Sequence, residues 1–532
     1  MNLAYILDEG LENTPCKTLF TGDGRSYTYN QVVRASENLA TGLRRLGYAP
    51  GCRIAVMLPN LPEYGLAMYG LWWLGAQPVL INPQLTLREL RHILLDSQAQ
   101  AVITTADLLP TLAPLRCLPP MLTFIVVGGE VPAGDLSFVE LTATAGRSGI
   151  LRLHPTDTAA LLYTSGTTGE PKAALLTHGN FWAIAQSSRI AIEGTPKDHL
   201  LCVLPLFHSF GCMVALVLFA LMGASVTFEH RLTPKRLMEH LRDPRLSFLI
   251  AVPNLLSTLL RFPADFRLTE NLRCVCCGGS ALHPQVEADF RARFGDIVRQ
   301  GYGLTECVSS TTLNPLPGPV RPGSIGKPLP GGPELAVCDP QTGALLGEGQ
   351  VGELLIRGPH VFKGYHNRPE ASAAVFLDGW LRSGDLGYRD ADGYYFVVDR
   401  IKDVIIVSGQ NVYSQEVEKV LLSHRAVREA AVVGDPDPDK GEVVHAYVSL
   451  HEGATVGEAE LVHYARSQLA PIKVPRRLTV VEALPKSPTG RILKRRLRPQ
   501  AVAADPEASG VEVEHHANGG APAAAGALPC KK

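Results

Sequence analysis

The chain has 532 residues, more than one ordinary hydrophobic core accommodates, so its size alone predicts two or more domains. Its 50 basic and 51 acidic residues leave a net charge of −1, which gives no electrostatic reason to expect nucleic acid or an anionic membrane as the main partner. A hydrophobic content of 46% with 19% charged residues is ordinary for a soluble enzyme.

The N-terminus shows no basic stretch followed by an apolar core, so we expect no secretory signal. Eleven irregularly spaced cysteines, several in apolar runs such as 200–204, favour the reducing cytoplasm. The apolar stretch 212–228 falls short of the roughly 20 residues that span a membrane and is interrupted by Gly223 and Ser225. It predicts a buried helix followed by a strand. Peripheral membrane contact and a homodimer remain open.

From Gly51 onwards, short apolar runs alternate with helix-like segments. The predicted strands are 54–58, 79–81 and 101–104, and the predicted helices are 63–74 and 87–95. This βαβαβ order indicates parallel strands with helices on the sheet faces. A similar rhythm returns from His199 to Cys277. The cluster Cys274–Cys277 lacks a second ligand pair at metal spacing, so we read it as a strand and not as a zinc site.

After Arg400 the pattern changes to a compact α+β unit, with predicted helices 415–422 and 458–469 and predicted strands 430–433 and 443–450. We therefore place a domain boundary between Arg400 and Ile401, which gives domains 1–400 and 401–500. Residues 501–532 are rich in Ala, Gly and Pro without a periodic apolar face, and they predict a disordered tail.

The segment 163–172 reads Tyr-Thr-Ser-Gly-Thr-Thr-Gly-Glu-Pro-Lys and follows an apolar run. Glycines let backbone N–H groups approach an anion, hydroxyls add donors and lysine adds charge, so this loop is predicted to bind phosphate. It is not the P-loop of kinases and GTPases, because Pro171 precedes Lys172 and Ala173 follows it. A run of Ser, Thr and Gly alone is more often a solvated loop, so the prediction depends on the motifs that accompany it.

Further motifs follow in a fixed order. They are Pro-Leu-Phe-His-Ser-Phe-Gly at 205–211, Gly-Gly-Ser at 278–280, Gln-Gly-Tyr-Gly-Leu-Thr-Glu at 300–306, Gly-Trp-Leu-Arg-Ser-Gly-Asp at 379–385, Asp-Arg-Ile-Lys-Asp at 399–403, Ser-Gly-Gln-Asn-Val-Tyr at 408–413 and Pro-Lys-Ser-Pro-Thr-Gly-Arg at 485–491. In this order and spacing, residues 10–498 resemble the acyl-adenylate-forming superfamily, which comprises acyl-CoA synthetases, peptide-synthetase adenylation domains and luciferases. Within it, 301–307 and 407–413 are most similar to bacterial long-chain fatty-acid CoA ligases.

The resemblance implies an α/β fold: a large N-terminal domain of two α/β sheets plus a small β-barrel, followed by a small mobile C-terminal domain. It also implies a two-step reaction with Mg²⁺, ATP and coenzyme A. A fatty acid reacts with ATP to give acyl-AMP and pyrophosphate, and the CoA thiol then displaces AMP. Catalysis in such a site is mainly positioning and electrostatics, because two anions must be brought together.

The resemblance assigns the phosphate contacts to one loop and one turn. Glu306 is implied to hold Mg²⁺, since a hard carboxylate suits a hard cation, and Thr305 is implied to donate to the α-phosphate. Lys172 completes the phosphate loop. The residues implied to bind the nucleotide are Thr164, Ser165, Gly166, Thr167, Thr168, Gly169, Gly278, Gly279, Ser280, Gly301, Tyr302, Gly303, Asp385 and Arg400.

Base and sugar are implied to lie between three segments. Tyr302 lies against the adenine ring and the turn at Gly278 approaches its other side, while Asp385 and Arg400 reach the ribose hydroxyls. Ser383 stands where the family more often has threonine, which keeps the hydroxyl. His208 is placed at the mouth of the acyl pocket, although a core histidine without a catalytic role is the alternative.

For the second step, the resemblance implies that the C-terminal domain rotates about Lys402. The face brought in by that rotation includes Ser408, Gly409 and Gln410, and Gly409 leaves room for the narrow pantetheine arm of CoA. The alternative reading of Gly409 is a simple turn glycine.

The final motif departs from the family, because Arg491 stands where the catalytic lysine is expected. Arginine keeps the charge but is longer, planar and bidentate, so the exchange is not conservative. Lys486 and Lys494 flank it as partial substitutes. The departure puts adenylation in doubt more than nucleotide binding.

Amino-acid activation is set aside, because no aspartate stands near Phe207 and no carrier segment follows. The apolar segment 210–219 favours a fatty acid. An aryl acid and a carrier-protein thiol stay open as alternatives. A hypothesis of another class is an acyl- and nucleotide-binding protein whose adenylation is impaired by Arg491.

Overall fold

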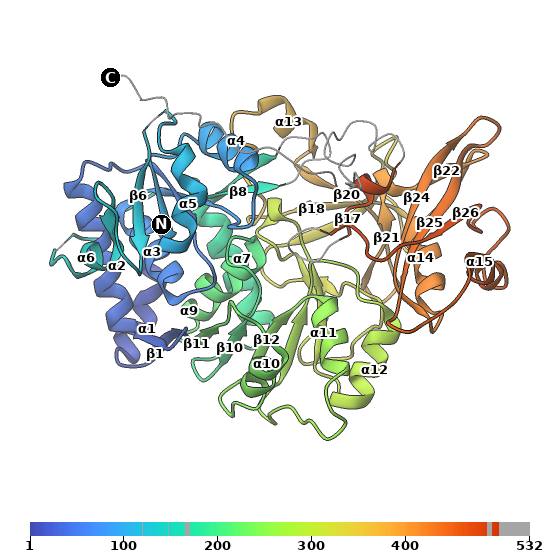
Figure 1. Ribbon diagram of the computed structural model, residues 1–532, viewed down its shortest axis with the longest axis horizontal. Coiled ribbons are helices and arrows are strands. Elements are labelled where there is room, and N and C mark those ends of the chain that lie inside the picture. The colour runs from blue at the N-terminus through green and yellow to red at the C-terminus, as the bar shows by residue number, and fades with distance from the viewer. Residues whose placement is uncertain (120, 147, 165–170, 487–491, 499–532) are drawn as a thin grey trace, which may run out of the picture.

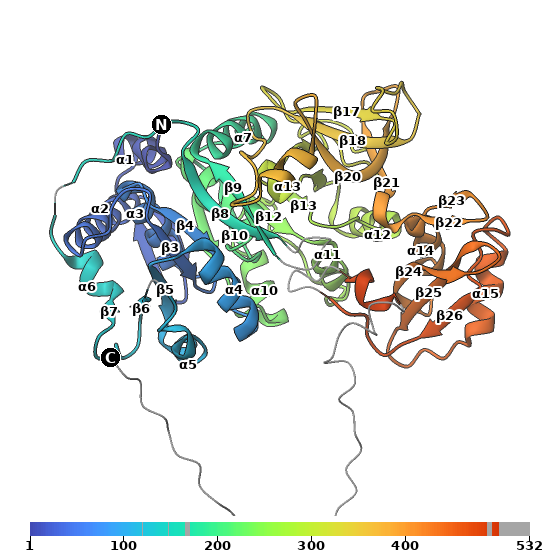
Figure 2. The same cartoon turned by 90° about the horizontal axis from the view of Figure 1, so that it is seen from above.

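The computed structural model describes residues 1–119, 121–146, 148–164, 171–486 and 492–498. Three sheets build the larger N-terminal part, and a fourth lies in a smaller C-terminal unit at one end of the molecule (Figures 1 and 2). The tail 501–532, together with 165–170 and 487–491, is outside the described residues, so the predictions made for them stay predictions.

The first sheet has seven strands in the order β7-β6-β5-β3-β4-β8-β9. Their bounds are β3 Arg53–Met57, β4 Gln77–Leu80, β5 Ala101–Thr105, β6 Thr123–Val127, β7 Leu136–Ser137, β8 Thr158–Thr164 and β9 Lys172–Thr177. All neighbours are parallel except β8 and β9, which form an antiparallel pair around the phosphate loop. The predicted βαβαβ unit is confirmed.

The second sheet has nine strands in the order β16-β15-β14-β13-β12-β10-β11-β1-β2. Their bounds are β1 Thr18–Gly22, β2 Arg25–Thr28, β10 His199–Cys202, β11 Ser225–Phe228, β12 Phe248–Ala251, β13 Cys274–Cys277, β14 Val298–Tyr302, β15 Thr312–Leu313 and β16 Lys327–Pro328. The cysteine cluster is strand β13, as predicted. In the part of the chain that the structure describes, no group of three or more His, Cys, Asp or Glu side chains is arranged to hold a metal ion.

The helices begin where the sequence supplies ordinary start signals. The main helices are α1 Asp8–Asn13, α2 Tyr29–Arg45, α3 Pro62–Leu74, α4 Leu87–Ser97, α5 Leu109–Leu112, α6 Phe138–Ala143, α7 His178–Ala191, α10 Pro234–Leu241, α11 Pro253–Leu260, α12 Pro284–Phe294 and α13 Pro369–Ala374. Capping boxes at Thr28, Thr86 and Thr177 open α2, α4 and α7. A proline at the first turn opens α3, α10, α11 and α12.

The apolar stretch 212–228 is a buried helical segment followed by β11, as predicted. Its helical part comprises the π-helix η4 Cys212–Leu218 and α9 Phe219–Leu221, and the short helix α8 Ser209–Gly211 precedes it. All seven side chains of η4 are buried in the main core, next to the face of the second sheet that carries Leu200 and Ile250. None of the helices among the described residues combines the length and the apolar character needed to cross a bilayer.

The third sheet contains β17 Glu334–Cys338, β18 Gly352–Arg357, β19 Phe376–Leu377, β20 Trp380–Arg389 and β21 Tyr395–Arg400. The pairings run β17-β18-β20, and both β19 and β21 pair with β20. The expected small barrel is therefore a five-stranded antiparallel sheet whose pairings do not close into a ring among the described residues. Its buried side chains, among them Leu335, Val337, Leu354 and Ile356, belong to the main apolar cluster and not to a separate core.

The C-terminal unit has strands β22 Ile405–Val407, β23 Gln410–Val412, β24 Val427–Asp437, β25 Gly441–Leu450 and β26 Arg477–Val480, with helices α14 Ser414–Leu422 and α15 Glu458–Arg466. Its predicted helices and strands are confirmed. It has a separate apolar cluster that includes Val417, Leu421, Val432, Val448 and Leu461, as an independent core requires.

Gly326 joins the second and third sheets. Its carbonyl accepts the Tyr395 N–H at 3.0 Å, its φ is +86°, and a Cβ there would lie 2.1 Å from the Leu313 carbonyl carbon. We expect Gly326→Ala to destabilise the protein by at least about 2 kcal/mol, because both conformation and space forbid the methyl group. Gly393→Ala is the matched control, with a φ of +80° and open space, and should cost about 1 kcal/mol. Thermal unfolding of both variants checks this, and equal losses would contradict it.

Candidate active site

The predicted nucleotide residues gather at the carboxyl-end edge of the second sheet. The turn Gly278–Ser280 follows β13, and Gly301–Tyr302 end β14. Parallel strands bring their carboxyl ends to one edge, where ligands of α/β proteins bind. Gly279 has a φ of +82°, so the turn uses a conformation that favours glycine. Both segments therefore meet, as the sequence predicts.

Asp385 lies at the centre of the residues that are predicted to bind the adenine base and the ribose. Tyr302 Oη donates to Asp385 Oδ2 at 2.7 Å, and Arg400 Nε lies 3.0 Å from Asp385 Oδ1. Burial, reinforced by the Asp385 carboxylate, raises the pKa of Tyr302 well above its ordinary value, so its hydroxyl stays a donor. Ser383 Oγ accepts the Asp385 N–H at 3.0 Å, so serine at this position supplies the hydroxyl contact.

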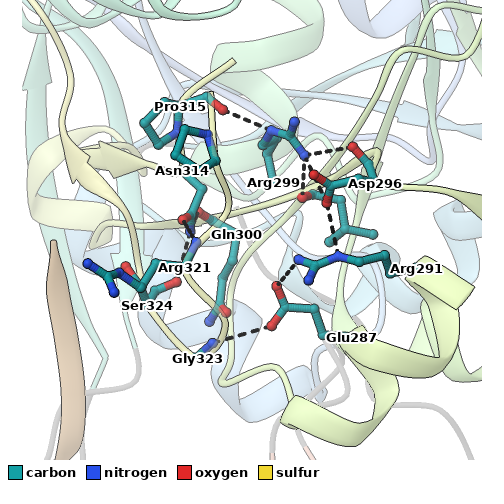
Figure 3. Close-up of polar contacts among 12 residues, drawn as sticks. Glu287, Arg291, Asp296, Arg299, Gln300, Asn314, Pro315, Arg321, Gly323 and Ser324 are labelled. Atoms are coloured by element: carbon teal, nitrogen blue, oxygen red, sulfur yellow. Dashed lines mark hydrogen bonds and ion pairs between the residues drawn. The ribbon is translucent and has the colours of Figure 1, made fainter. Parts of the chain in front are cut away.

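A polar network behind β14 holds its end in place (Figure 3). Arg299 donates to the Pro315 carbonyl at 2.9 Å, and Asn314 Nδ2 donates to the Gln300 carbonyl at 3.0 Å. Glu287 on α12 accepts the Gly323 N–H at 3.3 Å. The loop 315–324 is thus tied to both α12 and β14, which fixes the strand that carries Tyr302.

The turn after β14 is tightly packed. A Cβ on Gly303 would lie 2.1 Å from the Ser309 carbonyl oxygen, and one on Gly301 would lie 2.9 Å from the Thr312 carbonyl oxygen. Val308 and Ser309 adopt left-handed φ values of 51° and 73°, unusual for side-chain-bearing residues. Packing of the turn therefore requires both glycines, independently of any nucleotide.

Glu306 and Lys172 meet through a residue that the sequence motifs do not include. Tyr365 Oη donates to Glu306 Oε1 at 2.7 Å, and Lys172 Nζ lies 5.7 Å from the centre of the Tyr365 ring. Thr305 begins the short helix η5 Thr305–Cys307 that carries Glu306. The structure thus brings the predicted metal ligand beside the strand that ends the phosphate loop. A single carboxylate suits Mg²⁺, which retains waters and phosphate oxygens as its other ligands.

His208 lies at the start of α8, in contact with the aromatic ring of Phe207 at 4.7 Å between centroids. Its Nε2 is buried without a hydrogen-bond partner among the described residues, and burial lowers the pKa of His208 to about 4. Phe207 and Phe210, which lie close to it in the sequence, are partly buried, and a Cβ on Gly278 would lie 3.5 Å from the Phe210 ring. An unpaired neutral imidazole beside a half-buried apolar surface fits a ligand-facing residue better than a satisfied core histidine.

A hollow of about 310 Å³ opens at the point where the strand order of the second sheet reverses, between β10 and β12. Val203, Leu204, Val252 and Leu255 contribute its apolar wall, and Asn254 contributes an amide. Its helices α10 and α11 belong to the apolar cluster on the sheet face opposite η4. Such reversal points are common ligand sites in open α/β sheets.

The residues predicted to serve CoA form a turn in the C-terminal unit. Ser408 and Gly409 have φ values of 50° and 78° and form an exposed two-residue hairpin loop between β22 and β23. Lys402 lies in the short helix η6 Ile401–Asp403, and Arg498 donates to its carbonyl at 2.8 Å. The turn alone accounts for glycine at 409, and the hinge and CoA roles stay predictions.

The two lysines near Arg491 are engaged elsewhere. Lys494 Nζ lies 2.7 Å from Glu418 Oε1 and 2.6 Å from Ser414 Oγ, and Lys486 is paired with Glu429. Arg491 itself lies outside the described residues. In this conformation neither lysine is available to replace it without breaking an ion pair.

Tyr365 is the main site residue that sequence reasoning missed. Its only sequence signal is the aromatic residue after Gly364, which is common in any loop. The contact with Glu306 spans 59 residues and depends on chain pairing that periodicity does not reveal.

Comparison with known proteins agrees with this geometry. The family model described as AMP-binding enzyme matches residues 7–366, and the model of the AMP-binding enzyme C-terminal domain matches residues 416–491. The chain belongs to the AMP-binding enzymes. Its place is in their acyl-CoA synthetase branch, whose members use ATP, Mg²⁺ and CoA.

Among its relatives are a long-chain-fatty-acid–CoA ligase of Bacillus subtilis, 33% identical over 93% of this chain and 94% of the relative, and a feruloyl-CoA synthase of Amycolatopsis, 34% identical over 91% and 96%. The solved o-succinylbenzoate CoA synthetase of Bacillus subtilis, in complex with ATP and magnesium ion, has a TM-score of 0.82 at 31% identity, covering 92% of this chain and 98% of that one. Relatives of similar identity thus act on different acids.

The lowered pKa of His208 predicts how the rate of pyrophosphate release depends on pH. With a folded pKa of about 4 against an ordinary value of 6.5, the ring is neutral throughout pH 6–8. His208→Gln should therefore change the rate of pyrophosphate release without changing its pH dependence in that range. The ring signal of His208 in NMR spectra, assigned by its loss in the variant, should not titrate above pH 5. Titration near pH 6.5 would contradict the buried, unpaired imidazole.

Proposed function

We propose that this AMP-binding enzyme is an acid–CoA ligase for an apolar carboxylic acid, with a fatty acid as the first candidate. It activates the acid with ATP to acyl-AMP and transfers the acyl group to CoA. The observation that carries the proposal is the meeting of two residue groups around the end of β14, where Tyr302 is followed four residues later by Glu306. Asp385, Tyr302 and Arg400 suit a nucleoside, whereas Glu306, Tyr365 and Lys172 suit its phosphates.

The proposed chemistry uses charge placement. Asp385 accepts the ribose hydroxyls and keeps Arg400 beside them, while Lys172 and Thr305 stabilise negative charge that develops on the phosphates. Mg²⁺, when bound through Glu306, neutralises charge on phosphate oxygens. His208, neutral at physiological pH, orients the acid at the pocket mouth without adding a second cation.

The apolar side chains next to His208 favour an apolar acid as the substrate. The partly buried rings of Phe207 and Phe210, which lie close to His208 in the sequence, offer an acid apolar contact and no hydrogen-bond donor. An aryl acid is the second candidate, because the rings of Phe207, Phe210 and Tyr302 could stack on it.

The hollow between β10 and β12 is the proposed site for the pantetheine arm of CoA, the acceptor of the acyl group. It lies beside Gly279, since a Cβ on that glycine would meet Val252 at 3.6 Å, and its apolar wall suits the pantetheine arm. We propose that the C-terminal unit, with a boundary at Arg400 and Ile401, turns about Lys402 to bring Gly409 to this side. The ten free cysteines of the described residues support a cytoplasmic location.

Pyrophosphate release with a panel of fatty and aryl acids tests the proposal. At least one apolar acid should support release, and addition of CoA should then yield the thioester. Thermal stabilisation by ATP with no release from any acid would instead support a binding protein with impaired adenylation.

The arginine at position 491 leads to a further prediction, about the rate of adenylation. If it occupies the place of the catalytic lysine, its guanidinium fits imperfectly between carboxylate and α-phosphate. Arg491→Lys should speed adenylation by tens-fold, because about 1.4 kcal/mol already gives a factor of ten. Thioester formation from supplied acyl-AMP should hardly change, since rotation carries residue 491 away in that step.

Arg491→Ala is the companion variant and should abolish the remaining adenylation. A lysine variant no faster than the parent would mean that arginine is fully competent here. An alanine variant equal to the parent would mean that another group acts, and Lys494→Ala would identify it if its ion pair with Glu418 opens during the reaction.

A further inference from the structure

The segment Gly358–His366 connects the phosphate-loop strand to the loop that carries Glu306. The Leu175 N–H of β9 donates to the Gly364 carbonyl at 2.9 Å, and the His366 N–H donates to the Ala173 carbonyl at 2.8 Å. At its other end, the Phe362 N–H donates to the Glu306 carbonyl at 2.7 Å. The backbone of this segment is therefore fixed to both halves of the phosphate site.

Tyr365 is held within this segment by contacts on several sides. Its N–H donates to Ser372 Oγ at 2.8 Å, and the Phe362 ring packs edge-on at 4.9 Å between centroids. Lys172 Nζ lies over the ring, 5.7 Å from its centre, within reach of an attraction between cation and π face. The phenol therefore has one well-defined direction, and its hydroxyl meets Glu306 Oε1 at 2.7 Å.

The contact also has a defined polarity. The phenol is the donor, because an ionised carboxylate offers only acceptor oxygens. A hydrogen bond to a charged acceptor is stronger than one between neutral groups. It occupies Oε1, while Oε2 has no hydrogen-bond partner among the residues that the structure describes.

An unrestrained glutamate has several rotatable bonds, and ordering it around a cation costs conformational entropy. A carboxylate fixed before binding avoids that cost. We propose that Tyr365 is a positioning residue that fixes Glu306 through Oε1 and presents Oε2 to the divalent cation, while its ring keeps Lys172 beside the same phosphates. The inference rests on the proposed metal role of Glu306.

Tyr365→Phe tests the inference, because it removes the hydroxyl and keeps the ring under Lys172. The Mg²⁺ concentration for half-maximal pyrophosphate release should rise about tenfold, and excess Mg²⁺ should restore most of the rate. Binding of Mn²⁺, followed by its electron paramagnetic resonance signal with a non-hydrolysable ATP analogue, should weaken by a similar factor. The KM for the acid should not change.

Tyr27→Phe is the matched control. Tyr27 Oη donates to Glu63 Oε1 at 2.8 Å, a tyrosine–glutamate contact of nearly the same length formed between β2 and α3, away from the proposed site. It should leave the Mg²⁺ dependence of the rate and the Mn²⁺ affinity at parent values. Thermal unfolding of both variants measures the purely structural cost of losing such a bond.

Glu306→Gln separates the inference from its premise. It should reduce Mn²⁺ affinity strongly, and adding Tyr365→Phe to it should lower affinity less than twofold further, because the two residues act through one contact. Parent-like Mn²⁺ binding by Glu306→Gln would overturn the metal role itself. A weakened Glu306→Gln with an unchanged Tyr365→Phe, or full additivity in the double variant, would overturn only the positioning role of Tyr365.

Discussion

The buried carboxylate of Asp385 is the contact on which the arrangement of this protein depends. It lies on β20 of the third sheet, yet its partners are Tyr302 at the end of β14 in the second sheet and Arg400 at the end of β21. A buried carboxylate without hydrogen-bond partners would be strongly unfavourable. The contacts that Asp385 requires therefore fix the second sheet, the third sheet and the start of the C-terminal unit relative to one another. The same contact holds together the residues proposed to bind the nucleoside.

A second junction lies on the phosphate side. The segment around Tyr365 pairs with β9 and contacts the Glu306 loop, so the metal ligand and the phosphate-loop lysine are fixed by one stretch of backbone. Together, the two junctions fix the residues proposed to bind base, sugar and phosphate, while the C-terminal unit follows after η6. The proposed rotation about Lys402 requires such a division.

In the proposed function, the acid and the reaction rate depend on different residues. The apolar side chains of Phe207 and Phe210 are proposed to select the acid, whereas Arg491 is proposed to set the rate of its activation. The ion pairs of Lys494 with Glu418 and of Lys486 with Glu429 hold the flanks of that motif in the C-terminal unit.

The sequence by itself determined the local features of this protein. Alternating apolar runs predicted both parallel sheets, capping residues and prolines marked the helix starts, and the order of motifs predicted the residues now found around Asp385 and Glu306. These features follow from short-range periodicity and from chemistry that one loop carries alone.

Only the tertiary structure decided how distant segments meet. It showed that Tyr365 bonds Glu306 across 59 residues, that the pairings of the third sheet do not close into a ring among the described residues, and that neighbouring carbonyls require Gly301 and Gly303. Such contacts join residues far apart in the chain, and no local pattern records them, because the packing of whole sheets sets which backbone approaches which side chain.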